Sequence, residues 1–70
     1  MHIAEHTGLV GRRVRILTDK GEEVVGVISA ECWQRFYFKE ADIKNASGAF
    51  VTKPLFTVGK GQIAELEQLP

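Results

Sequence analysis

Residues Val14 to Gly26 have the sequence Val-Arg-Ile-Leu-Thr-Asp-Lys-Gly-Glu-Glu-Val-Val-Gly, and this stretch decides the fold. Val14, Ile16 and Thr18 recur at every second position, which is the period of a half-buried strand. Gly21 ends an Asp-Lys-Gly turn, where a left-handed backbone closes a three-residue hairpin loop. Gly26 interrupts the second strand and predicts a bulge or sharp bend. The stretch therefore indicates a strand that curls through two faces of a small barrel.

Further strands follow at regular spacing. We expect strands at residues 12–18, 22–31, 35–43, 50–58 and 62–69, joined by short turns rich in glycine. Pro54 cannot donate to a ladder and predicts an edge position for its strand. The pattern predicts an all-β fold, a small five-stranded antiparallel meander closed into a barrel. Thr7 is a candidate cap for a short helical turn before the barrel.

Alternate turns of such a meander lie at the same end of the sheet. We therefore expect the turn at residues 32–34 beside the turn at 59–61. The turn at 19–21 and the loop at 44–48 should lie at the opposite end.

The length of 70 residues predicts one domain, 1–70, with an N-terminal segment at 1–10 and a barrel at 11–69. A chain this short buries only about 60–65% of its unfolded surface and is marginal by itself. Cys32 is the only cysteine, so no internal disulfide can reinforce the fold, and we expect oligomerisation instead. The first residues lack a long apolar run, so we expect no signal peptide, no membrane span and a cytoplasmic location.

Charge and motif content argue against several classes of function. Nine basic and nine acidic residues cancel, which excludes a strong global field for nucleic acid. Cys32 has no histidine at motif spacing and is interpreted as a small, partly buried thiol. His2 and His6 could share a helical face, but two ligands alone hold a metal poorly. We therefore expect no enzymatic activity, no metal and no cofactor.

Trp33 is the residue best suited to a binding surface. It lies in a turn, where it either packs over the barrel end or presents a flat ring for stacking on an unpaired base. Glu31 and Arg35 flank it at two residues on either side and could contact the edge of that base. Lys60, expected at the same barrel end, is either a phosphate contact or an ordinary solvated turn residue.

Two segments resemble signatures of the Sm and Sm-like (LSm) protein family, to which bacterial Hfq is related. Val14-Arg15-Ile16 through Gly21 to Gly26 is similar to the first signature, in which a turn ends in glycine and a second glycine follows five residues later. The segment Phe-Thr-Val-Gly-Lys-Gly-Gln-Ile at 56–63 is similar in shape to the second signature. The resemblance covers about residues 10–69.

The resemblance implies a small, strongly bent, five-stranded barrel of the SH3 type, which assembles into a ring and binds single-stranded RNA near a central pore. The family's base pocket uses an acid, an aromatic residue or histidine, and an asparagine, each two residues apart after the second strand. Glu31, Trp33 and Arg35 occupy these positions, with arginine in place of asparagine. The family's second-signature arginine aligns with Gly59, one place before Lys60. The expected RNA-binding residues are Glu31, Trp33, Arg35, Gly59, Lys60 and Gly61.

Ring assembly also has a physical reason, because an open sheet leaves two edge strands with unpaired backbone groups. The strands at 50–58 and 62–69 carry few charges that would blunt such an edge. Head-to-tail pairing between copies would close a homo-oligomeric ring of about five to seven subunits. The expected interface residues are Phe56, Val58, Ile63 and Leu66. The alternative is a structural or adaptor ring that contacts proteins without binding nucleic acid.

Overall fold

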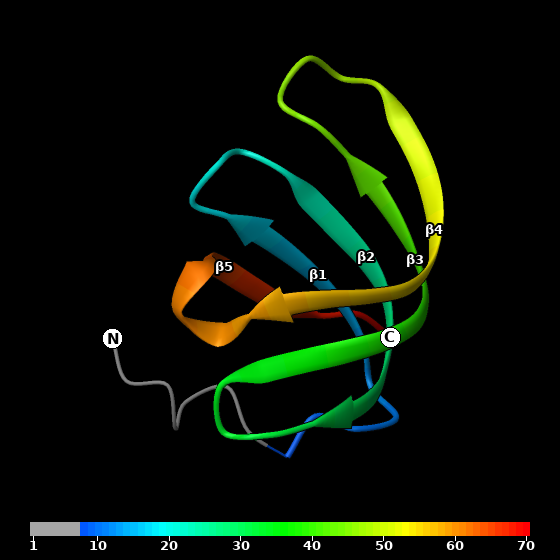
Figure 1. Ribbon diagram of the computed structural model, residues 1–70, viewed down its shortest axis with the longest axis vertical. Helices are drawn as coiled ribbons and strands as arrows, with labels where there is room; N and C mark the ends of the chain where they lie inside the picture. The colour runs from blue at the N-terminus through cyan, green and yellow to red at the C-terminus, as the bar shows by residue number, and fades with distance from the viewer. Residues whose placement is uncertain (1–7) are drawn as a thin grey trace.

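The computed structural model describes residues 8–70, which form five strands and one short 3-10 helix. The elements are β1 (Arg13–Thr18), β2 (Glu23–Glu31), β3 (Arg35–Lys44), β4 (Phe50–Gly59), η2 (Lys60–Gln62) and β5 (Ile63–Gln68). They form one antiparallel sheet in the order β4-β3-β2-β1-β5. Figure 1 shows β4 curving around the molecule toward η2 and β5. The predicted strongly bent all-β barrel is confirmed, although no ladder between β4 and β5 closes it within residues 8–70.

The first hairpin forms as its sequence predicts. Val14, Ile16 and Thr18 are buried, which confirms the two-residue period of β1. Gly21 has a φ of 81°, the left-handed conformation that the turn requires. The buried Thr18 hydroxyl accepts hydrogen bonds from the backbone N–H groups of Lys20 and Glu22 at 3.3 and 3.2 Å. The turn is therefore fixed by its own side chain as well as by the strands. The expected helical turn capped by Thr7 lies outside the described residues.

Gly26 marks the bend in the sheet. It pairs with Ala41, whereas the next pair along the two strands is Ile28 with Phe38, so β3 bulges opposite β2. A Cβ at Gly26 would lie 2.9 Å from the Glu40 carbonyl oxygen, which is closer than side chains tolerate. A glycine is thus required for β2 and β3 to approach each other at the bend.

The core lies inside the fold of the sheet. Its buried apolar side chains come from the N-terminal segment and from all five strands: Leu9, Val14, Ile16, Val24, Ile28, Phe36, Phe38, Ala41, Ile43, Val58 and Ile63. The turns lie together at the two barrel ends in the predicted pairs. The Lys60 N–H donates to the Gln34 carbonyl at one end, and a hollow at the other is lined by both Gly21 and Ala46. Residues 8–70 contain no helix of the length and apolarity needed to cross a bilayer.

Candidate nucleic-acid interface

Two turns join to form the barrel end that carries Trp33. The Cys32 N–H donates to the Arg35 carbonyl at 3.0 Å, which closes the turn between β2 and β3. The Lys60 N–H then donates to the Gln34 carbonyl at 2.8 Å, and this bond links that turn to η2. Trp33 therefore lies on a loop that is fixed from two sides.

Lys60 and Glu31 form an ion pair inside this barrel end. The Lys60 Nζ lies 2.9 Å from Glu31 Oε2, and the lysine side chain is 0% exposed. The same Nζ lies 4.7 Å from the centroid of the Phe36 ring, in cation–π range. A buried lysine needs such partners, because an unpaired ammonium away from water is strongly destabilised. Lys60 thus connects η2 to the end of β2.

Glu31 extends this network to the N-terminal segment. Its Oε1 accepts a hydrogen bond from the Leu9 N–H at 2.8 Å, and its side chain is 15% exposed. Burial raises the pKa of Glu31. The hydrogen bonds from Lys60 and Leu9, together with the lysine charge, lower it by more than burial raises it, so the pKa lies below its ordinary value. The carboxylate therefore stays ionised and holds three segments of the chain together.

The sequence left two positions open for Trp33, packed over the barrel end or exposed. The residue is 70% exposed, so its ring lies outside the core. Arg35 is also exposed and makes no ion pair among the described residues. Glu31 and Lys60, by contrast, face inward and neutralise each other. Of the residues expected to contact RNA, Trp33 and Arg35 present free side chains, while Glu31 and Lys60 support the loop.

The remaining predicted residues divide between backbone and core positions. Gly59 pairs with Arg35 and precedes η2, and Gly61 is exposed within η2. Val58 and Ile63 belong to the core of the protomer, whereas Phe56 and Leu66 are partly buried and pack against it. Only Phe56 and Leu66 of the expected interface set therefore keep exposed surface.

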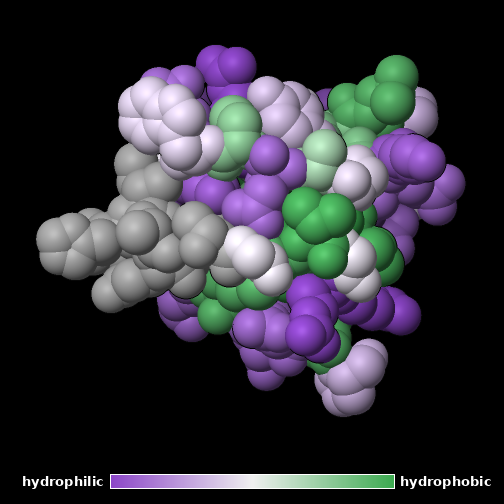
Figure 2. Space-filling model, turned by 90° about the horizontal axis from the view of Figure 1, so that it is seen from below, coloured by the Kyte–Doolittle hydropathy of each residue, from purple (hydrophilic) through white to green (hydrophobic). Residues whose placement is uncertain are grey.

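The sequence alone did not indicate the exposed apolar residues of β4. Phe50, Val51 and Leu55 are all exposed, and Leu55 reaches 83%. Leu55 also has a φ of 54°, a left-handed conformation that leucine rarely adopts. On the face seen in Figure 2, hydrophobic and hydrophilic side chains are interspersed.

Cys32 lies beside Trp33 and is exposed. The Gln34 N–H hydrogen bond to its sulfur lowers the thiol pKa below the ordinary value, against a smaller opposing effect of burial. The Tyr37 hydroxyl, 3.8 Å from Sγ, acts in the same direction. Cys32 is thus an exposed thiol rather than the partly buried one that the sequence indicated.

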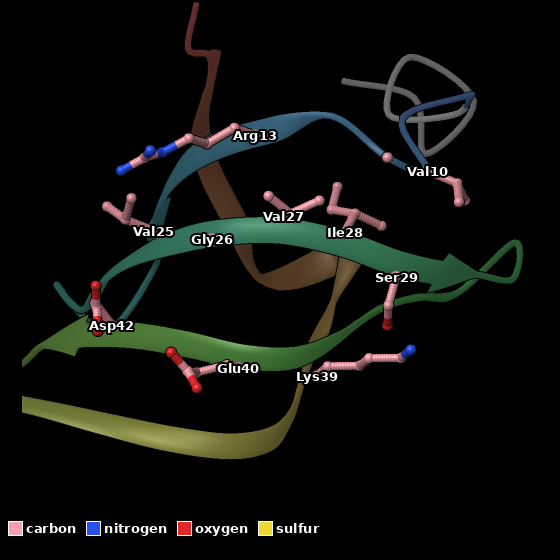
Figure 3. Close-up of a pocket in the computed structure, with 11 residues that line it drawn as sticks. Val10, Arg13, Val25, Gly26, Val27, Ile28, Ser29, Lys39, Glu40 and Asp42 are labelled. Carbon is pink, nitrogen blue, oxygen red and sulfur yellow. The ribbon is translucent and has the colours of Figure 1, made fainter.

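A separate hollow of about 580 Å³ lies over β2 and β3 near the bend. Figure 3 shows Arg13, Glu40 and Asp42 toward one end of it, and Ser29 and Lys39 toward the other. The Ser29 hydroxyl donates to the Tyr37 carbonyl at 3.0 Å and is therefore engaged. None of the residues expected to bind RNA lines this hollow.

Residues 8–70 contain no group of three or more histidine, cysteine, aspartate or glutamate side chains placed to hold a metal ion. His2 and His6 lie outside the described residues. No protein-family model matches the chain, and no curated protein matches it at a significant level.

Proposed function

We propose that this chain is a non-catalytic, Sm-like cytoplasmic protein that assembles into a homo-oligomeric ring and binds single-stranded RNA. The observation that carries the proposal is the exposed Trp33 ring beside Arg35, on a turn that the buried Lys60 fixes in place. Trp33 stacks on an unpaired base, an interaction worth about 1–3 kcal/mol per base. Arg35 contacts the base edge or the backbone.

Preorganisation supports a binding role for this turn. A loop that is already ordered loses little conformational entropy when a ligand binds. The bond from Lys60 to the Gln34 carbonyl and the ion pair with Glu31 hold both sides of the turn. Lys60 therefore positions Trp33 rather than contacting a phosphate, which refines the role expected from the sequence.

The open sheet edges support ring assembly. β4 pairs only with β3, and β5 only with β1, so the outer backbone groups of both strands are free among residues 8–70. The exposed Phe50, Val51 and Leu55 add apolar surface to the β4 edge. Pairing β4 of one copy with β5 of the next is head-to-tail and forms a ring if the rotation closes. Every copy then brings its Trp33 and Arg35 to the same face of the ring.

An adaptor ring without nucleic acid is the second candidate. It is favoured by the internal neutralisation of Glu31 and Lys60, which leaves Arg35 as the free charge of the two turns at the Trp33 end of the barrel. Phosphate contacts supply much of the affinity of nucleic-acid-binding proteins. One free cation per copy at the Trp33 end of the barrel would make few such contacts. In this case the ring would contact proteins through its surface.

Titration of the full-length chain with oligo-U and oligo-A at low salt separates the two candidates. RNA binding predicts a change in Trp33 fluorescence together with an increase in the anisotropy of a labelled oligonucleotide. W33A should weaken binding about 5- to 150-fold, which corresponds to the loss of stacking. K20M is the matched control, because Lys20 is an exposed cation in the turn at the opposite barrel end. An intact ring that binds neither oligonucleotide would contradict RNA binding and favour the adaptor.

A further inference from the structure

The hydrogen-bonding character of the Trp33 site follows from which charges are free. The two turns, residues 31–35 and 59–62, carry Glu31, Arg35 and Lys60. Both Glu31 oxygens accept hydrogen bonds from within the protein, Oε1 from Leu9 and Oε2 from Lys60. The Lys60 side chain has no exposed surface.

Arg35 is thus the one free charged side chain of these two turns in the described structure. A guanidinium carries N–H donors only and has no acceptor. The carboxylate that could have accepted a hydrogen bond from the amino group of a base is engaged inside the barrel. The charged side chains of the Trp33 site therefore offer a base hydrogen-bond donors from Arg35 and no free carboxylate acceptor.

We infer that the base recognised beside Trp33 is guanine, an inference that rests on the proposed RNA-binding function. Guanine presents two adjacent acceptors, O6 and N7, which match two parallel N–H donors of Arg35. Adenine places its amino group next to N7, so a donor faces the guanidinium. Uracil has two acceptors, O2 and O4, but the N3–H donor lies between them, so they do not form an adjacent pair. Stacking on Trp33 holds any base, whereas Arg35 favours a base with two adjacent acceptors. Cytosine also has such a pair, O2 and N3, but its single ring stacks over less of the indole than the double ring of guanine.

The test uses single strands of about ten nucleotides with alternating composition, UG, UA and U alone, in a lithium buffer that discourages guanine quadruplexes. Anisotropy with the full-length chain should show the UG strand binding about 5- to 150-fold tighter than the other two, the range of one bidentate base contact. Replacing guanine by 7-deazaguanine removes N7 and should abolish the preference. Inosine keeps O6 and N7 and should retain it.

Two variants connect the preference to Arg35. R35M should lower the affinity for the UG strand to that for U alone. R35K should lose part of the preference, because an ammonium lacks the planar fork that aligns two N–H donors with O6 and N7. A preference for the UA strand would overturn the inference and implicate the Gln34 amide, which suits adenine. Equal binding of all strands, or a guanine preference that survives 7-deazaguanine, would also overturn it while leaving the proposed function standing. Failure to bind any strand would refute the proposed function itself.

Discussion

Removing the Lys60 ammonium tests whether the buried ion pair holds the barrel end together. K60M leaves the Glu31 carboxylate, 15% exposed, without its cation 2.9 Å away. Breaking a buried pair from one side costs about 3–5 kcal/mol, and the residual exposure of Glu31 favours the lower end, about 3 kcal/mol. A domain of this length has a total stability of only about 4–10 kcal/mol. The variant should therefore lose about 30% or more of the free energy of unfolding.

Urea unfolding followed by far-ultraviolet circular dichroism measures this loss, at one fixed protomer concentration because assembly contributes to stability. Urea is uncharged and does not screen the ion pair. With a slope of about 1.5 kcal/mol per M, the midpoint of K60M should fall by about 2 M. E31Q should cost a similar amount, since it leaves the Lys60 ammonium buried beside a neutral amide. The double variant E31Q/K60M should cost about 3–4 kcal/mol rather than 6. Costs that add to within about 0.5 kcal/mol would refute the coupling.

The pair also predicts how stability depends on pH. The pKa of Glu31 is lower in the folded chain than its ordinary value. Its contribution is therefore fully present above the ordinary glutamate pKa and is lost as the pH falls through the folded pKa. Unfolding midpoints measured from neutral to acid pH should fall less steeply for E31Q than for the unmodified chain. Parallel curves would show that Glu31 does not contribute to the acid sensitivity.

Three further predictions concern the bend, the thiol and the open edge. G26A should destabilise the fold by about 1–3 kcal/mol, because the new Cβ would lie 2.9 Å from the Glu40 carbonyl oxygen. G61A is the control, because a Cβ at Gly61 meets nothing within 4 Å. Equal urea midpoints for the two variants would contradict the requirement for glycine at the bend. The rate of Cys32 alkylation should rise with pH at a lower midpoint in the folded chain than in the urea-unfolded chain, because the Gln34 N–H hydrogen bond lowers the thiol pKa. Profiles that coincide would refute this. L55D should reduce the assembled mass, because it places a charge in the proposed β4 interface. The circular dichroism spectrum should stay unchanged, because Leu55 is 83% exposed in the protomer. An unchanged mass would show that Leu55 is not part of the interface.

The parts of the fold that depend on local patterns could be predicted from the sequence. The alternation in β1 and the left-handed Gly21 are set by short-range sterics, and Gly26 marks where the sheet bends. The meander order then brought the Trp33 turn and η2 together, as the bond from Lys60 to Gln34 confirms. These features require no knowledge of side chains far away in the chain.

The Glu31–Lys60 pair could not be predicted in the same way. Simple alternation from Ile28 places Ala30 inside and Glu31 outside. A bulge between Ile28 and Ala30 reverses this phase, so that Glu31 pairs with the buried Phe36 and faces Lys60. One extra residue in a strand moves each following side chain to the other face. The position of such a bulge depends on the partner strand, which the pattern of β2 alone does not contain.

Ring closure through the free edges of β4 and β5 is the claim on which the RNA-binding proposal depends. The most direct test is the mass of the full-length chain at micromolar concentration, by light scattering and by native mass spectrometry. We expect one discrete species of about five to seven copies of the 7.8 kDa chain. A folded species of 7.8 kDa, with the circular dichroism of a β-protein and cooperative unfolding, would contradict the account.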